Sequence, residues 1–130
     1  MTDIFIDANF YIYLNCFTDN YDSKYIELLN DYDTYTNVLA FDEVIYISYK
    51  KYNIKFDDTI DFIKNSVIPF TNILDLTINE YKKASEIILN YKTKPSDSLH
   101  IATMLNNNIF NILTEDSDFN NIDKIKKIWL

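Results

Sequence analysis

The chain has 130 residues, of which 48% are hydrophobic, so we expect one hydrophobic core and a single domain spanning residues 1–130. It contains no glycine, which excludes the ATP-binding and dinucleotide-binding loops whose backbone must approach a phosphate closely. Its net charge of −8 argues against binding a nucleic acid through a positive field alone, so a polyanionic substrate would need a metal ion.

The sequence favours a protein of the reducing cytoplasm. Its one cysteine, Cys16, cannot form an intramolecular disulfide. The start of the chain lacks the basic flank of a signal peptide. The longest uncharged run, Ser98 to Thr114, contains His100 and several asparagines, so we expect no association with a membrane.

In chain order, the first part of the sequence predicts one strand followed by three helices. The short apolar run Ile4–Ile6 predicts a buried strand. Apolar residues at helical spacing predict helices over Asp7–Thr18 and Ser23–Tyr32. A loop is expected at Asp33–Asn37, and Asp42 is the expected cap of the helix that follows.

The second part of the sequence predicts strands and helices in alternation. The predicted helices are Asp57–Ser66, a helix from Thr77 to about Tyr91 that opens with a capping box, and Ser96–Asn106 directly after Pro95. The predicted strands are Asn72–Leu76, Ile109–Leu113 and a short edge strand at Lys127–Leu130. This alternation indicates a three-layer α/β/α sandwich with a mainly parallel central sheet.

Acidic residues follow the predicted strands or begin predicted helices at one edge of this sheet. Asp7 follows the first strand, and Asp116 and Asp118 follow the strand that ends at Leu113. Glu43 and Asp97 lie in the first turns of two helices expected to begin at the same edge. Because open parallel sheets bind ligands at the carboxyl ends of their strands, we expect these four segments to deliver acids to one place.

A cluster of carboxylates repels itself and raises its own pKa values unless a positive charge sits among them. The chain has no arginine for that role, whereas Mg²⁺ and Mn²⁺ prefer oxygen ligands of this kind. Such ions can bind a phosphate and activate water for an in-line displacement. The cluster therefore indicates hydrolysis of phosphodiester bonds.

The ordered motifs are Ile4-Phe5-Ile6-Asp7-Ala8-Asn9, Glu43, Pro95-Ser96-Asp97-Ser98-Leu99-His100-Ile101-Ala102 and Thr114-Glu115-Asp116-Ser117-Asp118-Phe119. Together they resemble PIN-domain ribonucleases, most closely the single-domain VapC-type toxins of prokaryotic toxin–antitoxin pairs. The resemblance spans nearly the whole chain. It implies a metal-dependent endoribonuclease that leaves a 5′-phosphate and a 3′-hydroxyl.

The resemblance also implies a role for each site residue. Those expected to act in catalysis and to bind Mg²⁺ or Mn²⁺ are Asp7, Glu43, Asp97 and Asp116, with Asp118 assisting at the metal. Asn9 and Thr114 are expected to support the site. The expected partners are an RNA substrate and a small antitoxin whose arginine or lysine would enter the acidic cleft. Aromatic-rich helical faces favour a homodimer.

Each acid also has an ordinary structural interpretation. Asp7 and Asp97 resemble residues that cap a helix or lie in its first turn, and Asp42, beside Glu43, suits the helix dipole. Asp116 and Asp118, which follow the predicted strand Ile109–Leu113, resemble residues of a solvated turn. The residues whose part in metal binding the sequence leaves open are Glu115, Asp116 and Asp118.

Other polar residues have two interpretations each. His100, the only histidine, lies on an apolar helix and is expected to be structural and outside the site. The many tyrosines suit a core or an interface as well as the stacking of RNA bases. Lysines such as Lys50, Lys51 and Lys55 suit a solvated helix face as well as phosphate contacts.

Two alternative functions compete with the nuclease. A catalytically inactive PIN-like module that binds RNA or protein is favoured by the few basic residues. A phosphoacceptor or phosphatase site with Asp7 as nucleophile fits less well. Such sites usually have a second aspartate nearby and a lysine after a later strand, where this chain has Asn9 and the acids after Thr114.

Overall fold

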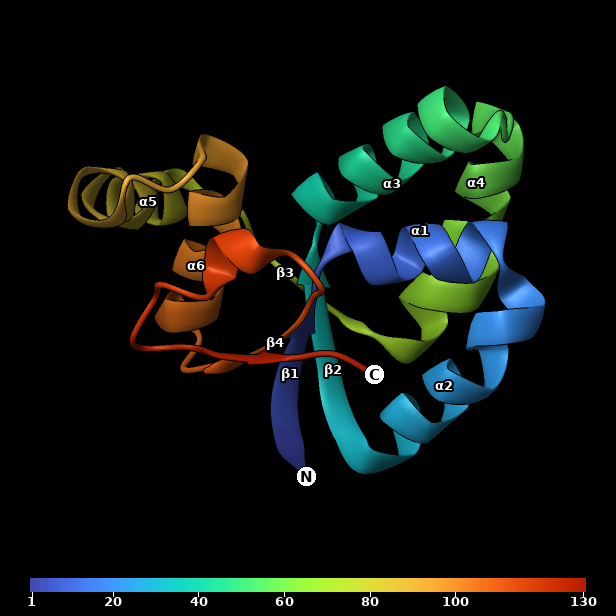
Figure 1. Cartoon of the computed structure of the whole chain (residues 1–130), viewed down its shortest axis with the longest axis horizontal. Coiled ribbons are helices and arrows are strands. Elements are labelled where there is room, and N and C mark those ends of the chain that lie inside the picture. The colour runs from blue at the N-terminus through green and yellow to red at the C-terminus, as the bar shows by residue number, and fades with distance from the viewer.

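Five parallel strands form the central sheet of the computed structural model, which describes residues 1–130. The strands are β1 (Thr2–Ile6), β2 (Tyr32–Asn37), β3 (Asn72–Leu74), β4 (Asn111–Leu113) and β5 (Lys126–Ile128). Their order across the sheet is β3-β2-β1-β4-β5, and every neighbouring pair is parallel (Figure 1). The first strand of the chain therefore lies at the centre of the sheet.

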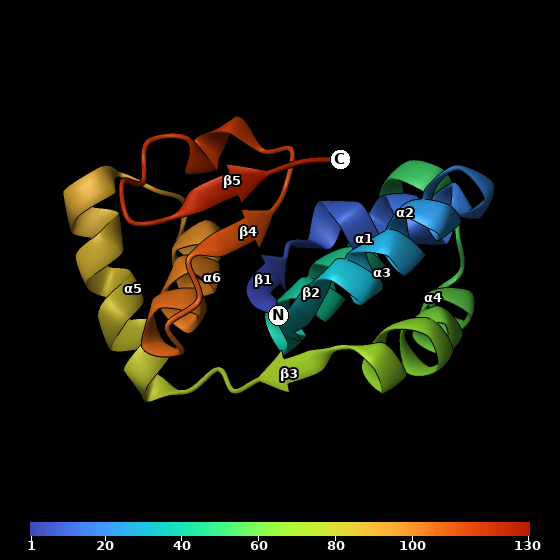
Figure 2. The ribbon, with the colours of Figure 1, turned by 90° about the horizontal axis from the view of Figure 1, so that it is seen from below.

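Helices cover both faces of this sheet. They are α1 (Ala8–Cys16), α2 (Thr18–Asp31), α3 (Val38–Tyr52), α4 (Phe56–Phe62), α5 (Ile78–Tyr91) and α6 (Pro95–Asn106), with short helical turns at Ile63–Val67, Ile68–Phe70 and Ser117–Phe119. Figure 2 shows α1 to α4 on one side of the sheet and α5 and α6 on the other. The predicted three-layer α/β/α sandwich is confirmed, and the sheet is wholly parallel.

The alternation of side chains along β1 divides the hydrophobic core in two. Ile4 and Ile6 pack with α1, α2 and α3, whereas Phe5 faces the other way and packs with α5 and α6. All three side chains are fully buried. A central parallel strand is covered on both faces, which is why this short apolar run was recognisable in the sequence.

The prediction of a loop at Asp33–Asn37 is wrong, because this segment forms the strand β2. This segment has few aliphatic residues, but it pairs with β1 on one side and β3 on the other. Thr34 and Thr36 are buried, and the Thr36 hydroxyl donates to the carbonyl of Ile6 at 3.0 Å. In β2, buried threonines whose hydroxyls form hydrogen bonds take the place of the apolar residues by which a central strand is usually predicted from sequence.

Helix α3 begins earlier than predicted, and its cap is Asn37 instead of Asp42. The Asn37 side-chain oxygen accepts from the backbone N–H of Ala40 at 3.1 Å, in the way expected of an N-terminal cap. Asp42 is exposed one turn further along. Glu43 consequently lies in the second turn of α3 and not in its first.

The other elements follow the predicted order with shifted ends. Helix α2 begins at Thr18, five residues before the predicted Ser23. The capping box is present, since the backbone N–H of Thr77 donates to Glu80 at 2.7 Å. Helix α6 begins at Pro95 itself, which needs no amide hydrogen at that position.

None of the helices combines the length and the apolar character that crossing a bilayer requires.

Candidate functional site

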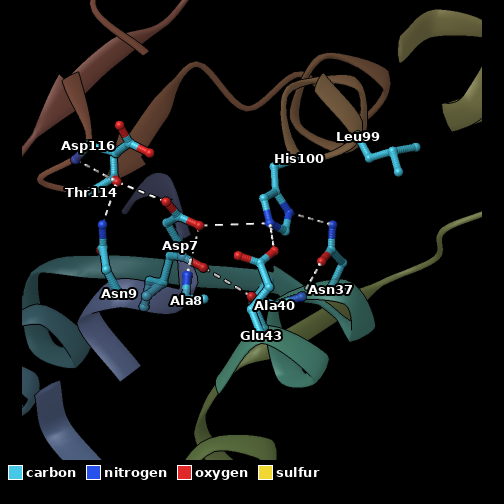
Figure 3. A network of polar contacts seen from close by, with 12 residues as sticks. Asp7, Ala8, Asn9, Asn37, Ala40, Glu43, Leu99, His100, Thr114 and Asp116 are labelled. Atoms are coloured by element: carbon cyan, nitrogen blue, oxygen red, sulfur yellow. Dashed lines mark hydrogen bonds and ion pairs between the residues drawn. The ribbon is translucent and has the colours of Figure 1, made fainter. Parts of the chain in front are cut away.

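Asp7 lies where β1 ends and α1 begins, and both of its carboxylate oxygens accept hydrogen bonds. Oδ1 accepts from the backbone N–H of Ala8 at 2.8 Å, and Oδ2 accepts from the Thr114 hydroxyl at 2.8 Å (Figure 3). Asp7 is thus a helix cap, as its ordinary interpretation predicts, and is also tied to the end of β4. Its side chain is nearly buried, and this burial raises the pKa of Asp7.

The Thr114 hydroxyl joins the start of α1 to the loop after β4. While donating to Asp7, it accepts from the Asn9 side-chain amide at 3.0 Å and from the backbone N–H of Asp116 at 3.1 Å. Thr114 is fully buried, so water does not compete for these contacts. They fix Asp7 and the loop of Asp116 relative to one another.

Glu43 reaches this site from α3 and meets His100 from α6. The imidazole Nε2 lies 2.7 Å from Glu43 Oε1 and 3.7 Å from Asp7 Oδ1. These three residues place one ligand atom each within 4.8 Å of one another. His100 is fully buried between the two acids, so the expectation that it lies outside the site has to be corrected.

A second hydrogen bond fixes the tautomer of His100. The Asn37 amide nitrogen lies 3.2 Å from His100 Nδ1 and also donates to the Thr103 hydroxyl at 3.1 Å. Its oxygen is already occupied by the N–H of Ala40, which sets the orientation of the amide. Nδ1 therefore accepts from Asn37, and the N–H at Nε2 donates to Glu43.

Opposing effects act on the protonation of His100. Burial lowers its pKa, whereas the hydrogen bond to Glu43 and the charges of Asp7, Glu43 and Asp97 raise it, and the net direction is upward. The amide of Asn37 opposes protonation at Nδ1, because a protonated ring has no acceptor there. The residue is missed by sequence reasoning because its neighbours are apolar. Its spacing of three from Asp97, which places both on one helix face, is the signal that could have identified it.

The remaining acids form a second group beside the first. Asp97, Asp116 and Asp118 also bring one ligand atom each within 4.8 Å of one another. One cation touches them: the Lys94 ammonium lies 3.2 Å from Asp118 Oδ2. The structure therefore brings the predicted acids to one edge of the sheet, but as two adjoining groups.

Asp97 is the least satisfied of these acids. Its Oδ2 is buried and has no hydrogen-bond partner. Burial, followed by the charges of Asp7 and Asp116, raises the pKa of Asp97 to about 6. An unpartnered buried carboxylate among like charges is what a bound cation would relieve, so the residues present fit a divalent ion.

Glu115 lies apart from both groups. Its carboxylate accepts a hydrogen bond from the Tyr13 hydroxyl of α1. It lines a groove between α1 and α3 that adjoins the site at Asn9 and Asp116. Asp116 and Asp118 thus belong to an acidic group and Glu115 does not, while the part of each in metal binding stays a prediction.

Comparisons with known proteins place this geometry in context. A family model described as the PIN domain matches residues 4–125. A comparison with curated proteins gave no match.

Several solved structures are similar over nearly the full length of both chains. A DNA-bound VapBC from Salmonella typhimurium is 14% identical, with 99% of this chain and 98% of that chain covered and a TM-score of 0.77. VapC20 of Mycobacterium tuberculosis, described as a toxin that cleaves the sarcin-ricin loop, is 16% identical, with 94% and 96% covered and a TM-score of 0.75. A toxin–antitoxin complex from Klebsiella pneumoniae is 19% identical, with 95% of each chain covered and a TM-score of 0.69. At these identities the likeness shows a shared fold.

Proposed function

Because this chain belongs to the PIN domain family, we propose that it is a metal-dependent endoribonuclease that hydrolyses RNA phosphodiester bonds. The observation that carries the proposal is the convergence of carboxylates from separate segments around a buried, unpartnered oxygen of Asp97. Such a cluster is costly without a cation and suits Mg²⁺ or Mn²⁺. The products expected from the family resemblance are a 5′-phosphate and a 3′-hydroxyl.

The proposal gives each residue a task. The residues that would hold Mg²⁺ or Mn²⁺ and act in catalysis are Asp7, Glu43, Asp97 and Asp116, with Asp118 assisting at the metal. A bound ion of this kind would supply charge neutralisation for the phosphate and activation of water. Thr114 and Asn9 would keep the Asp7 carboxylate fixed, and His100 would hold Glu43 by donating its Nε2 hydrogen.

We further propose that the protein is the toxin of a toxin–antitoxin pair, acting in the cytoplasm. Support comes from the fold shared with the toxin–antitoxin complex from Klebsiella pneumoniae. The acidic groups would accept an arginine or lysine from a small partner. A homodimer stays a prediction. The exposed Tyr49 and Phe56, whose rings lie 4.7 Å apart, support it, and light scattering would test it.

The direct test replaces one acid at a time and measures RNA cleavage and Mn²⁺ binding. We expect Asp7→Asn and Asp97→Asn to abolish cleavage with the circular dichroism spectrum unchanged. Asp42→Asn is the matched control, because Asp42 is exposed beside Glu43 and lies in neither acidic group. Unchanged cleavage in both site variants would contradict the proposal.

The alternative of an inactive binding module predicts a different result. Its sign would be a flat calorimetric titration with Mn²⁺ and no rise in melting temperature on adding the ion. The phosphatase alternative is weakened by the acids Asp116 and Asp118 that follow β4, where such a site usually has a lysine.

A further inference from the structure

A groove of about 380 Å³ runs from the acidic site along the junction of α1 and α3, and we call it the α1–α3 groove. Asn9 and Asp116 line it where it meets the site, and Lys51 and Tyr52 line it at the C-terminal end of α3. Its volume lies within the range of sites for small molecules. Its lining combines carboxylate, amide, aromatic and ammonium groups, which is unlike a purely apolar packing defect.

The course of α3 explains why the groove continues the site. Glu43, Ile47 and Lys51 follow one another at intervals of four, so they lie on one face of the helix. At 1.5 Å per residue, Lys51 lies about 12 Å along the axis from Glu43. The face that brings Glu43 to the acids therefore also brings a positive charge to the far end of the groove.

Lys51 is distinguished from its neighbour by its surroundings. Like Lys50 it forms no ion pair, so its charge is available to a ligand, but of the two only Lys51 lines the groove. Lys50 points elsewhere, because its ammonium lies 5.5 Å from the centre of the Tyr46 ring and it does not line the groove. In a chain of net charge −8, Lys51 is the one cation that lines this groove.

Two aromatic rings give the groove fixed walls. Tyr52 packs edge-on against Phe17, with ring centres 5.4 Å apart, yet 36% of the residue stays exposed. Tyr13 is held by its hydrogen bond to Glu115 and by Trp129, whose ring centre is 6.1 Å away. Rings held in this way provide a stacking surface at little cost in side-chain entropy.

We propose that the α1–α3 groove binds a nucleotide of single-stranded RNA next to the phosphate that is cleaved. Its base lies against Tyr52, and a backbone phosphate lies on Lys51. An unpaired strand is required, because only an unstacked base can lie against a side chain. This inference rests on the proposed nuclease function, and it assigns the recognition of substrate to residues that hold no metal.

The test measures binding of a short fluorescein-labelled single-stranded RNA of mixed sequence by anisotropy. The protein carries Asp7→Asn to prevent cleavage, and the salt concentration is varied. We expect Tyr52→Ala to weaken binding about 5- to 100-fold, whereas Tyr52→Phe keeps most of the affinity because it keeps the ring. We expect Lys51→Ala to weaken binding and to reduce the slope of log K against log salt by about 0.7, the value for one phosphate contact.

Matched controls lie on the same helix. Lys50→Ala removes the same charge, and Tyr49→Ala removes a ring that packs on Phe56 outside the groove. Both should change the affinity less than twofold. If Lys51→Ala and Lys50→Ala weaken binding equally, while the protein with Asp7 intact cleaves RNA, the proposed binding of RNA in the groove is wrong. The proposed nuclease function would be unaffected by that result. A protein that neither cleaves nor binds the RNA would overturn both.

Discussion

His100 of α6 donates from Nε2 to Glu43 of α3 across 2.7 Å, and its other ring nitrogen accepts from Asn37 at the end of β2. The imidazole is thus held in one tautomer and holds Glu43 in turn. A buried group with partners on both sides sets the position of its neighbours more than an exposed one does.

Replacing His100 should disturb metal binding without unfolding the protein. We expect His100→Leu to weaken Mn²⁺ binding about 10- to 100-fold, the loss typical of groups that orient metal ligands. His100→Gln should restore much of the affinity, because its amide can donate to Glu43. Calorimetric titration with Mn²⁺ measures both, and equal affinity in the Leu variant and the native protein would contradict the role.

Metal binding should strengthen as the pH rises through about 6. The ion requires ionised carboxylates, and the pKa of Asp97 is raised to about 6, so protons compete for this ligand below that value. Titrations with Mn²⁺ at pH 5 and pH 7.5 would show the change. In Asp97→Asn the affinity should be low at both, and the dependence on pH that remains should come from Asp7, whose pKa burial also raises.

The same raised pKa predicts that Asp97→Asn stabilises the metal-free protein. The pKa is higher in the folded state than the ordinary 3.8, so the folded state is penalised once the group ionises. The contribution of protonated Asp97 to the free energy of unfolding is complete below pH 3.8 and is lost as the pH rises through about 6. Above that pH we expect a gain of about 1–2 kcal/mol, reduced by partial solvent screening, or roughly 4–8 °C in melting temperature.

Thermal unfolding in the presence of a chelator measures this gain. The two proteins should differ at pH 8 and coincide at pH 3. A lower melting temperature for Asp97→Asn at pH 8 would contradict the prediction that ionised Asp97 destabilises the metal-free protein.

Lys94 should compete with a metal ion for the second acidic group. Its ammonium pairs with Asp118 at 3.2 Å while both side chains are substantially exposed, so the pair stabilises the fold little. We expect Lys94→Ala to leave the melting temperature unchanged and to strengthen Mn²⁺ binding a few-fold. Lys83→Ala, which breaks the 3.7 Å pair with Glu86 on α5, is the control and should change neither.

Thr114→Val should affect both stability and the site. It removes a buried hydroxyl and leaves Asp7 Oδ2 and the Asn9 amide without their partner, at a cost of about 1–3 kcal/mol. Mn²⁺ binding should weaken as well, since Asp7 loses its anchor. Thr36→Val is the matched control, because it removes a buried hydroxyl that bonds only to the Ile6 carbonyl. It should lower the melting temperature and leave Mn²⁺ binding unchanged.

The sequence predicted those features that depend on local pattern. The apolar run of β1, the capping box at Thr77 and the acids after β1 and β4 are all properties of neighbouring residues. β2 escaped prediction because the burial of Thr34 and Thr36 depends on strands from elsewhere in the chain. Asn37 escaped as a cap for the same reason, since the helix boundary follows from where β2 ends.

The site shows the same division. The positions of the acids could be read from the chain, but their separation into two groups depends on where the contact between Glu43 and His100 forms and on the course of the loop after β4. The part played by His100 could not be read from apolar neighbours such as Leu99 and Ile101, because its partners lie on other elements.

The hydrogen bond between Thr114 and Asp7 joins residues 107 positions apart. Thr114 directly follows β4, so an N-terminal fragment under synthesis has Asp7 and Glu43 but lacks the loop that holds Asp116 and Asp118. The acidic centre therefore cannot be assembled until synthesis has passed Asp118, long after Asp7 and Glu43 have been added to the chain.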